Sequence, residues 1–307
     1  MTHALPLPAG VSVFERGWLS ANNILLVGDG PSTLIDSGYC THAEQTLALV
    51  SRALGERPLD LLVNTHLHSD HCGGNAALQA RYPAARTLVP PGHAQQVRDW
   101  DPVALTYEPT GQLCPRFRLD AALVPGSMLA MGAQSWEVHA APGHDPHSVI
   151  LFEPASRTLV SADALWESGF GVVFPELEGE SAFAEVGQTL DLIESLAPRV
   201  VIPGHGPVFT DVTGALATAR KRLRGFEEDP ARHARYAAKV LLKYKLLELK
   251  RFTQDELRGW ADRTRYLGLV RERWAPGIEP SAWLDQVVDE LAASGALRRE
   301  GTDIVDA

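Results

Sequence analysis

Three histidines and one aspartate within six positions constrain this chain more than any other feature: His66, His68, Asp70 and His71. They follow an apolar segment predicted to be a buried strand, residues 59–64, and precede a helical pattern that runs through residue 80. Four polar side chains on so tight a strand-to-helix turn cannot all be buried without partners. Imidazole nitrogen and carboxylate oxygen are ligand types that zinc and similar divalent ions take. The turn therefore predicts a metal site, and the crowding of the four residues favours a pair of ions.

One turn cannot complete two coordination spheres, so further ligands are expected from later turns. Three residues suit this role because each follows a strand-like segment: His144, Asp163 and His205. Glycine precedes both histidines, and a residue without Cβ lets the backbone come close to an ion. We therefore expect these three residues to complete the site. The alternative for Asp163 is a helix cap, a common role for aspartate at the end of a strand.

Strand and helix patterns alternate up to about residue 215 and predict an α/β first part. After that point the strand patterns stop, and three helical patterns occupy residues 236–249, 254–265 and 281–294. A short extended segment, residues 303–305, follows them. The prediction for this second part is a compact helical or winged-helix-like unit.

Charge is distributed unevenly and marks a boundary between the two parts. Residues 1–219 contain 10 Lys and Arg against 23 Asp and Glu, whereas residues 220–307 contain 18 against 15. All lysines lie at position 221 or later. We therefore predict a catalytic domain over residues 1–218 and a smaller C-terminal helical domain over residues 219–307. The acidic first part disfavours nonspecific binding to nucleic acid or to an anionic membrane.

The metal-ligand pattern resembles that of the metallo-β-lactamase superfamily over roughly residues 10–215. The His-x-His-x-Asp-His turn, the later histidine, the aspartate and the final Gly-His-Gly occur in the family's order. The resemblance implies an αββα sandwich with the site at one edge of its two sheets. It assigns His66, His68 and His144 to a first metal. It assigns Asp70, His71 and His205 to a second metal, with Asp163 as a bridge between the two.

The same resemblance implies hydrolytic chemistry, in which a hydroxide between two metals attacks the substrate. Asp70 and Asp163 are the predicted catalytic carboxylates. Zinc is the leading metal, with iron or manganese as alternatives. The pattern is most similar to hydroxyacylglutathione hydrolases and related thioesterases, although no basic glutathione-binding cluster is evident. The predicted function is therefore hydrolysis of a thioester or related ester or lactone, and a ribonuclease-like phosphodiesterase is the alternative.

Substrate-pocket residues are predicted mainly in the aromatic segment after Asp163. Its Trp166, Phe170 and Phe174 would form an apolar wall or pack beneath the C-terminal helices. Tyr39 is assigned to the pocket mouth, with a plain surface position as the alternative. His147 is assigned to the substrate side of the site, with a role unrelated to function as the alternative. Asp36 resembles the family's early aspartate, which implies that it supports the site from behind, with a plain strand-end turn as the alternative.

The expected partner is a small-molecule substrate, without a nucleic acid or a membrane, and a homodimer is compatible with the second part. Nothing resembles a signal sequence or a membrane span, and Cys40, Cys72 and Cys114 are few and far apart. These features predict a protein of the reducing cytoplasm.

Overall fold

The computed structural model describes residues 7–307 and contains a six-stranded sheet in the order β1-β2-β3-β4-β5-β6. Pairing is antiparallel from β1 to β3 and parallel from β3 to β6. The strands are β1 (Val11–Phe14), β2 (Asn23–Leu26), β3 (Thr33–Ile35), β4 (Leu61–Val63), β5 (Arg86–Val89) and β6 (Ala121–Ala122). Because β3 and β4 are parallel, their carboxyl ends meet at one edge of this sheet.

A second sheet has five strands in the order β11-β10-β9-β8-β7. Only the β10–β11 pair is parallel. The strands are β7 (Met128–Met131), β8 (Gln134–Ala140), β9 (Val149–Glu153), β10 (Thr158–Ala162) and β11 (Val200–Pro203). The carboxyl ends of β10 and β11 therefore lie beside the start of β9.

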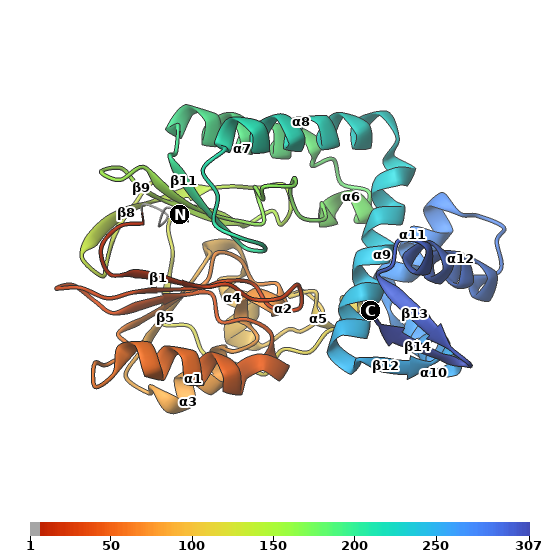
Figure 1. Cartoon of the computed structure of the whole chain (residues 1–307), viewed down its shortest axis with the longest axis horizontal. Coiled ribbons are helices and arrows are strands. Elements are labelled where there is room, and N and C mark those ends of the chain that lie inside the picture. The colour runs from red at the N-terminus through yellow and green to blue at the C-terminus, as the bar shows by residue number, and fades with distance from the viewer. Residues whose placement is uncertain (1–6) are drawn as a thin grey trace, which may run out of the picture.

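The two sheets stack face to face, and helices cover both outer faces (Figure 1). On the first sheet lie α1 (Ala43–Leu54) and α3 (Asn75–Arg81), and on the second lie α7 (Phe183–Leu196) and α8 (Val212–Glu228). Short helical pieces lie in the connections: η1 (Cys40–His42), α2 (Ser69–Cys72), η2 (Pro91–His93), α4 (Ala94–Asp99), α5 (Tyr107–Thr110) and α6 (Phe174–Glu178). This is the αββα sandwich that the sequence predicted.

The core between the sheets consists of side chains from alternate positions of facing strands. Ile24 and Val63 of the first sheet belong to the same apolar cluster as Trp136, Leu151 and Ile202 of the second. A separate cluster joins α7 and α8 to the outer face of the second sheet. Burial of these faces fixes the register of the strands in both sheets. A shift of one strand by one residue would turn its core side chains toward the opposite face of the sheet.

The C-terminal region is largely helical and packs against one end of the sandwich (Figure 1). Helix α8 leads into this region, which contains α9 (Pro230–Leu249), α10 (Gln254–Arg263), α11 (Arg265–Trp274) and α12 (Pro280–Ala293). A small antiparallel sheet joins β12 (Arg251–Thr253), β14 (Asp303–Asp306) and β13 (Leu297–Glu300) in that order. The strands β12 and β13 were not predicted, whereas the extended segment expected at residues 303–305 is confirmed as β14, and so is the helical character.

The charge boundary does not coincide with a break in the chain. Residues 218 and 219, where the predicted domains meet, both lie inside α8. The buried face of α8, which includes Ala215 and Leu223, packs in the same cluster as α7. Among residues 7–307, no helix is long and apolar enough to cross a membrane.

Candidate metal centre

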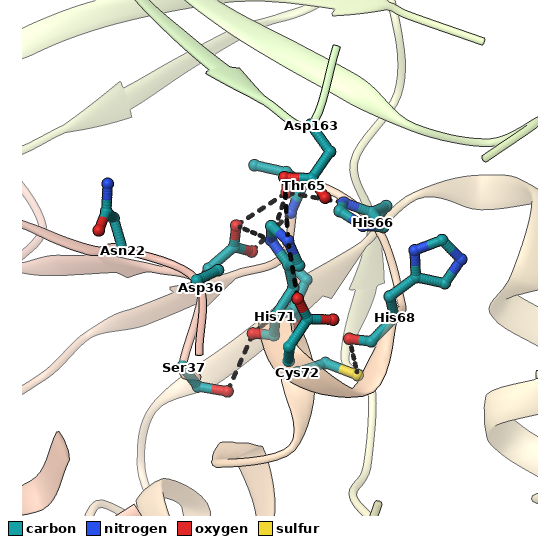
Figure 2. A network of polar contacts seen from close by, with 12 residues as sticks. Asn22, Asp36, Ser37, Thr65, His66, His68, His71, Cys72 and Asp163 are labelled. Atoms are coloured by element: carbon teal, nitrogen blue, oxygen red, sulfur yellow. Dashed lines mark hydrogen bonds and ion pairs between the residues drawn. The ribbon is translucent and has the colours of Figure 1, made fainter. Parts of the chain in front are cut away.

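The predicted ligands come from strand ends that meet at one edge of the sandwich. His66, His68, Asp70 and His71 follow β4, with Asp70 and His71 in the short helix α2. Asp163 follows β10, His205 follows β11, and His144 precedes β9. Strand direction thus brings together residues that are as many as 139 positions apart in the sequence. In Figure 2, Asp163 extends from one sheet toward the histidines that lie on the loop of the other.

A first group contains His66, His68 and His144, each of which offers a ring nitrogen within 4.8 Å of the other two. His68 Nδ1 lies 2.8 Å from His144 Nε2. The opposite nitrogen of His144, Nδ1, contacts the backbone carbonyl of Val172, which fixes the ring and leaves Nε2 directed into the group. Three imidazole nitrogens converging on one point form a suitable metal site.

A second group contains Asp70, His71, Asp163 and His205, again with ligand atoms within 4.8 Å of one another. Asp70 Oδ2 lies 3.0 Å from His205 Nε2 and 3.7 Å from His71 Nε2. Asp163 Oδ1 lies 3.4 Å from His71 Nε2 and 3.8 Å from His205 Nε2. Two carboxylates and two imidazoles supply both charge and nitrogen ligands for a divalent ion.

Asp163 connects the two groups through its two carboxylate oxygens. Oδ1 faces the second group, whereas Oδ2 lies 3.4 Å from His144 Nε2 in the first. A carboxylate that directs one oxygen to each group has the geometry of a bridging ligand. Together the two groups form a dinuclear-type site.

Unpartnered polar atoms support the fit of these residues to metal ions. Nε2 of His66 and Nε2 of His71 are buried and have no hydrogen-bond partner among the described residues. An orphaned buried nitrogen costs free energy, and a bound ion removes this cost. Gly204 allows the close packing of the site, because a Cβ at this position would lie 2.2 Å from Asp163 Oδ1.

Asp36 lies behind the site, in the place expected from the sequence. It follows β3 with φ of 55° and accepts hydrogen bonds from Thr65 N at 2.9 Å and Thr65 Oγ1 at 2.8 Å. Its Oδ2 is also 2.8 Å from His71 Nδ1 (Figure 2). This contact fixes the His71 tautomer with Nε2 free to bind metal.

The electrostatics of the site suit cation binding. Burial lowers the pKa of His66 well below its usual value and lowers that of His68 to about 4, so both rings are neutral ligands at pH 7. Burial alone would raise the pKa of Asp70, but the facing imidazoles of His71 and His205 lower it to about 2. Asp70 is therefore ionised throughout the neutral range.

A cavity of about 380 Å³ opens onto both groups. His68, Asp70, His144 and Asp163 line one side of it. The other side is mostly aromatic and aliphatic and comes partly from α9 and α12: Trp18, Trp166, Val172, Phe174, Tyr236, Val240, Leu241, Tyr244 and Leu291. The C-terminal region thus forms a wall of the cavity that contains the metal-binding residues.

The predicted pocket residues divide between this cavity and other places. Trp166 and Phe174 line the cavity, whereas Phe170 lies in the core beneath α7 and α8. His147 is away from the cavity lining, and its ring packs against His93. Tyr39 lies neither at the mouth of the cavity nor on the surface, the two positions expected from the sequence. It is fully buried, and its hydroxyl donates a hydrogen bond to Glu248 Oε2 at 3.0 Å.

Two aromatic residues at the site were missed by the sequence analysis. Trp18 stacks on His205 with ring centroids 5.4 Å apart and is half exposed at the cavity. Tyr244 of α9 places its hydroxyl 3.1 Å from Asp70 Oδ2. No motif marks either residue, because each reaches the site only through tertiary packing.

Comparison with known proteins agrees with this geometry. Residues 16–205 match the sequence profile of the Metallo-beta-lactamase superfamily, a range that contains every metal-binding residue described above. The chain belongs to this superfamily. Its buried His and Asp residues form the dinuclear-type site within the matched range.

Curated relatives include hydroxyacylglutathione hydrolases. That of Anaeromyxobacter dehalogenans (strain 2CP-C) is 35% identical over 161 residues, which are 52% of this chain and 52% of the relative. That of Acidiphilium cryptum (strain JF-5) is 29% identical over 198 residues, 64% of this chain and 69% of the relative. The chain spans about half the length of the first of these relatives.

Solved structures similar to this chain extend through the C-terminal region. A metallo-beta-lactamase family protein from Thermus thermophilus has a TM-score of 0.57 at 20% identity and covers 98% of this chain and 99% of its own. A beta-lactamase domain protein from Burkholderia ambifaria has a TM-score of 0.56 at 23% identity, with coverage of 99% and 94%. The combination of sandwich and C-terminal region therefore recurs as a fold.

Proposed function

We propose that this protein hydrolyses thioesters, or closely related esters and lactones, at its dinuclear metal site. The observation that carries the proposal is the cavity of about 380 Å³, with metal-binding residues on one side and aromatic and aliphatic side chains on the other. An apolar wall beside a polar reaction centre suits a substrate with an acyl chain and a polar carbonyl.

Two divalent ions held by these residues would lower the pKa of water to supply a nucleophile and would polarise the scissile carbonyl. The folded chain holds the carboxylates of Asp70 and Asp163 in position to bind these ions. Among the described residues that line the cavity, no imidazole or carboxyl group lies outside the two ligand groups. The other proton donors are engaged, since Lys239 and Lys243 are paired with carboxylates and the Tyr244 hydroxyl donates to Asp70. A thiolate leaves without a strong general acid, so this lining favours a thioester over an ester with a poor leaving group.

Charge at the cavity favours an acyl substrate over a nucleic acid. Two lysines line the cavity, and each is paired with a carboxylate. Lys239 Nζ lies 3.2 Å from Glu290 Oε2, and Lys243 Nζ lies 2.6 Å from Asp306 Oδ1. A phosphodiester track needs unpaired cations to neutralise phosphates, so the ribonuclease-like alternative has no comparable support.

The curated relatives support the thioester class, since hydroxyacylglutathione hydrolase names an enzyme that cleaves an acyl–sulfur bond. The proposal concerns the acyl side of the substrate. It does not extend to glutathione, because the paired lysines of the cavity leave no basic cluster for the glutathione carboxylates.

A hydrolysis screen of the metal-reconstituted protein tests the proposal. The substrates are acyl-glutathione, acyl-CoA, a lactone, bis-(p-nitrophenyl) phosphate and a short RNA. We expect turnover of a thioester or lactone, with longer acyl chains preferred over acetyl. RNA cleavage with a steep salt dependence, together with no thioester or lactone turnover, would overturn the proposal in favour of a nuclease.

A further inference from the structure

The second ligand group receives hydrogen bonds from two aromatic side chains outside the metal-binding turns. Trp166 Nε1 donates to Asp163 Oδ1 at 3.2 Å. Tyr244 OH donates to Asp70 Oδ2 at 3.1 Å and lies 3.3 Å from His205 Nε2. Tyr244 belongs to α9, so a residue of the C-terminal region directly contacts two of the four metal-binding residues of this group.

Helix α9 is anchored firmly enough to hold the Tyr244 hydroxyl in place. Its buried face, which includes Ala237, Ala238 and Leu241, lies in the apolar cluster of the C-terminal region. Four residues after Tyr244, Glu248 accepts hydrogen bonds from Tyr39 OH at 3.0 Å and from Lys245 Nζ at 2.7 Å. Tyr39 is fully buried within the sandwich, so this contact ties α9 to the catalytic part of the chain beside the site.

The first group has no such connection. The hydrogen-bond partners of its imidazole rings outside the group are Thr65, which is 3.2 Å from His66 Nδ1, and the carbonyl of Val172. His68 Nε2 also lies 3.9 Å from Asp145 Oδ2. Within residues 7–307, the C-terminal region donates no hydrogen bond to His66, His68 or His144. The contact through Tyr244 is therefore specific to the second group.

We propose that Tyr244 is a positioning residue that holds Asp70 in its ligand orientation and so sets the metal affinity of the second group alone. The contact is compatible with metal binding because a carboxylate oxygen has two lone pairs, one available to an ion and one to the phenol. Loss of a hydrogen bond to a metal ligand typically lowers metal affinity about 10–100-fold. Occupancy of the second position thereby depends on the docking of α9. The inference rests on the dinuclear site and is independent of the substrate class.

Competitive zinc titration of the metal-free, full-length protein against a chromophoric chelator tests this role. For the unmodified chain we expect two zinc equivalents. For Tyr244→Phe, which removes only the hydroxyl, we expect the affinity for one equivalent to fall about 10–100-fold while the other is unchanged. Tyr236→Phe is the matched control, because Tyr236 lines the same cavity from the same helix and, within residues 7–307, donates no hydrogen bond to a metal-binding residue. The Tyr236→Phe protein should bind both zinc equivalents with the affinity of the unmodified chain.

Two further readouts separate positioning from other roles. The Co(II)-loaded Tyr244→Phe protein should show a changed visible spectrum at one cobalt equivalent only, and its thermal unfolding should confirm that it folds. Hydrolytic activity should recover as zinc is raised to saturation. The proposal would be overturned if the affinity for both zinc equivalents fell equally or if neither affinity changed. A loss of activity that persists at saturating zinc would also overturn it.

Discussion

Trp166 donates a hydrogen bond from its indole nitrogen to Oδ1 of Asp163 at 3.2 Å. The same ring lines the cavity and packs edge-on against Trp18 with centroids 5.3 Å apart. One side chain therefore makes two separable contacts, because the N–H donates to the carboxylate that lies between the two groups and the ring forms part of the apolar wall. Of these two contacts, only the apolar wall was predicted from the sequence.

Two variants of Trp166 should separate these functions. Trp166→Phe keeps an aromatic ring and removes the N–H, so we expect kcat to fall about 10–100-fold with little change in KM. Trp166→Ala removes both, and should in addition raise KM for bulky acyl substrates more than for acetyl ones, as loss of uniform binding does. Steady-state kinetics on an acyl-chain series provides the measurement. An identical effect of both variants on all substrates would contradict the division.

Substitution of Asp163 by asparagine should abolish most turnover without unfolding the chain. Asp163→Asn keeps the size of the side chain but removes the charge that faces His71 and His144 at 3.4 Å each. We expect turnover to fall by several orders of magnitude, because the bridge positions both ions. Circular dichroism and thermal unfolding provide the control for folding. Near-normal activity in this variant would reduce Asp163 to a turn residue.

Metal content should be about two ions per chain, because the two groups supply seven ligand residues for two positions. Elemental analysis after gentle purification measures this number. Removal of metal by a chelator should also lower the melting temperature, since ions that bind only the folded chain stabilise it. A well-folded chain that remains metal-free when offered zinc, manganese or iron would contradict the assignment of these residues.

The metal-binding residues could be predicted because most of them lie close together in the sequence. Four of the seven residues lie within six positions, and the other three each adjoin a strand whose apolar pattern is plain. The periodicity of β4 and β10 specified where each strand ends, and the direction of the strands then brought the ends together. The alternation of elements predicted an α/β first part, and the αββα arrangement was implied by the resemblance of the ligand pattern to the superfamily.

Side-chain contacts that depend on tertiary packing were not predictable, because no local sequence pattern marks the two residues that meet. Tyr244 is one aromatic residue on an amphipathic helix, a pattern that usually indicates core packing. Cys72 and Cys114 are far apart in sequence, yet their sulfurs lie 3.8 Å apart. Helix α8 was missed because its Arg220–Arg224 segment is so highly charged that the apolar face, which includes Leu216 and Leu223, is hard to recognise.

A chain that ends near Gly225 should be poorly soluble and should lose acyl-chain selectivity. Truncation removes α9 and leaves Val172 and Leu177, which are buried against the C-terminal helices, exposed to solvent. It also removes one wall of the cavity. Soluble yield, size-exclusion profile and KM across an acyl-chain series would be compared with those of the full chain. A monodisperse truncated protein with unchanged selectivity would show that residues 226–307 do not shape the pocket.

Gly204 should tolerate no side chain, even alanine, although it lies in a turn. A Cβ there would lie 2.2 Å from Asp163 Oδ1 and 3.0 Å from His71 Cε1, both atoms of fixed metal-binding side chains. Gly204→Ala should therefore displace Asp163 and lower both metal content and turnover. The matched control is Gly187→Ala in the middle of α7, where the nearest atom, Leu223 Cδ2, would be at an ordinary contact distance of 3.7 Å. Because alanine is the better helix former, this control should raise the free energy of unfolding by about 0.5–1 kcal/mol and keep full activity. Equal activity in the two variants, measured with metal content and urea denaturation, would mean that the close approach of Gly204 to Asp163 has no functional importance.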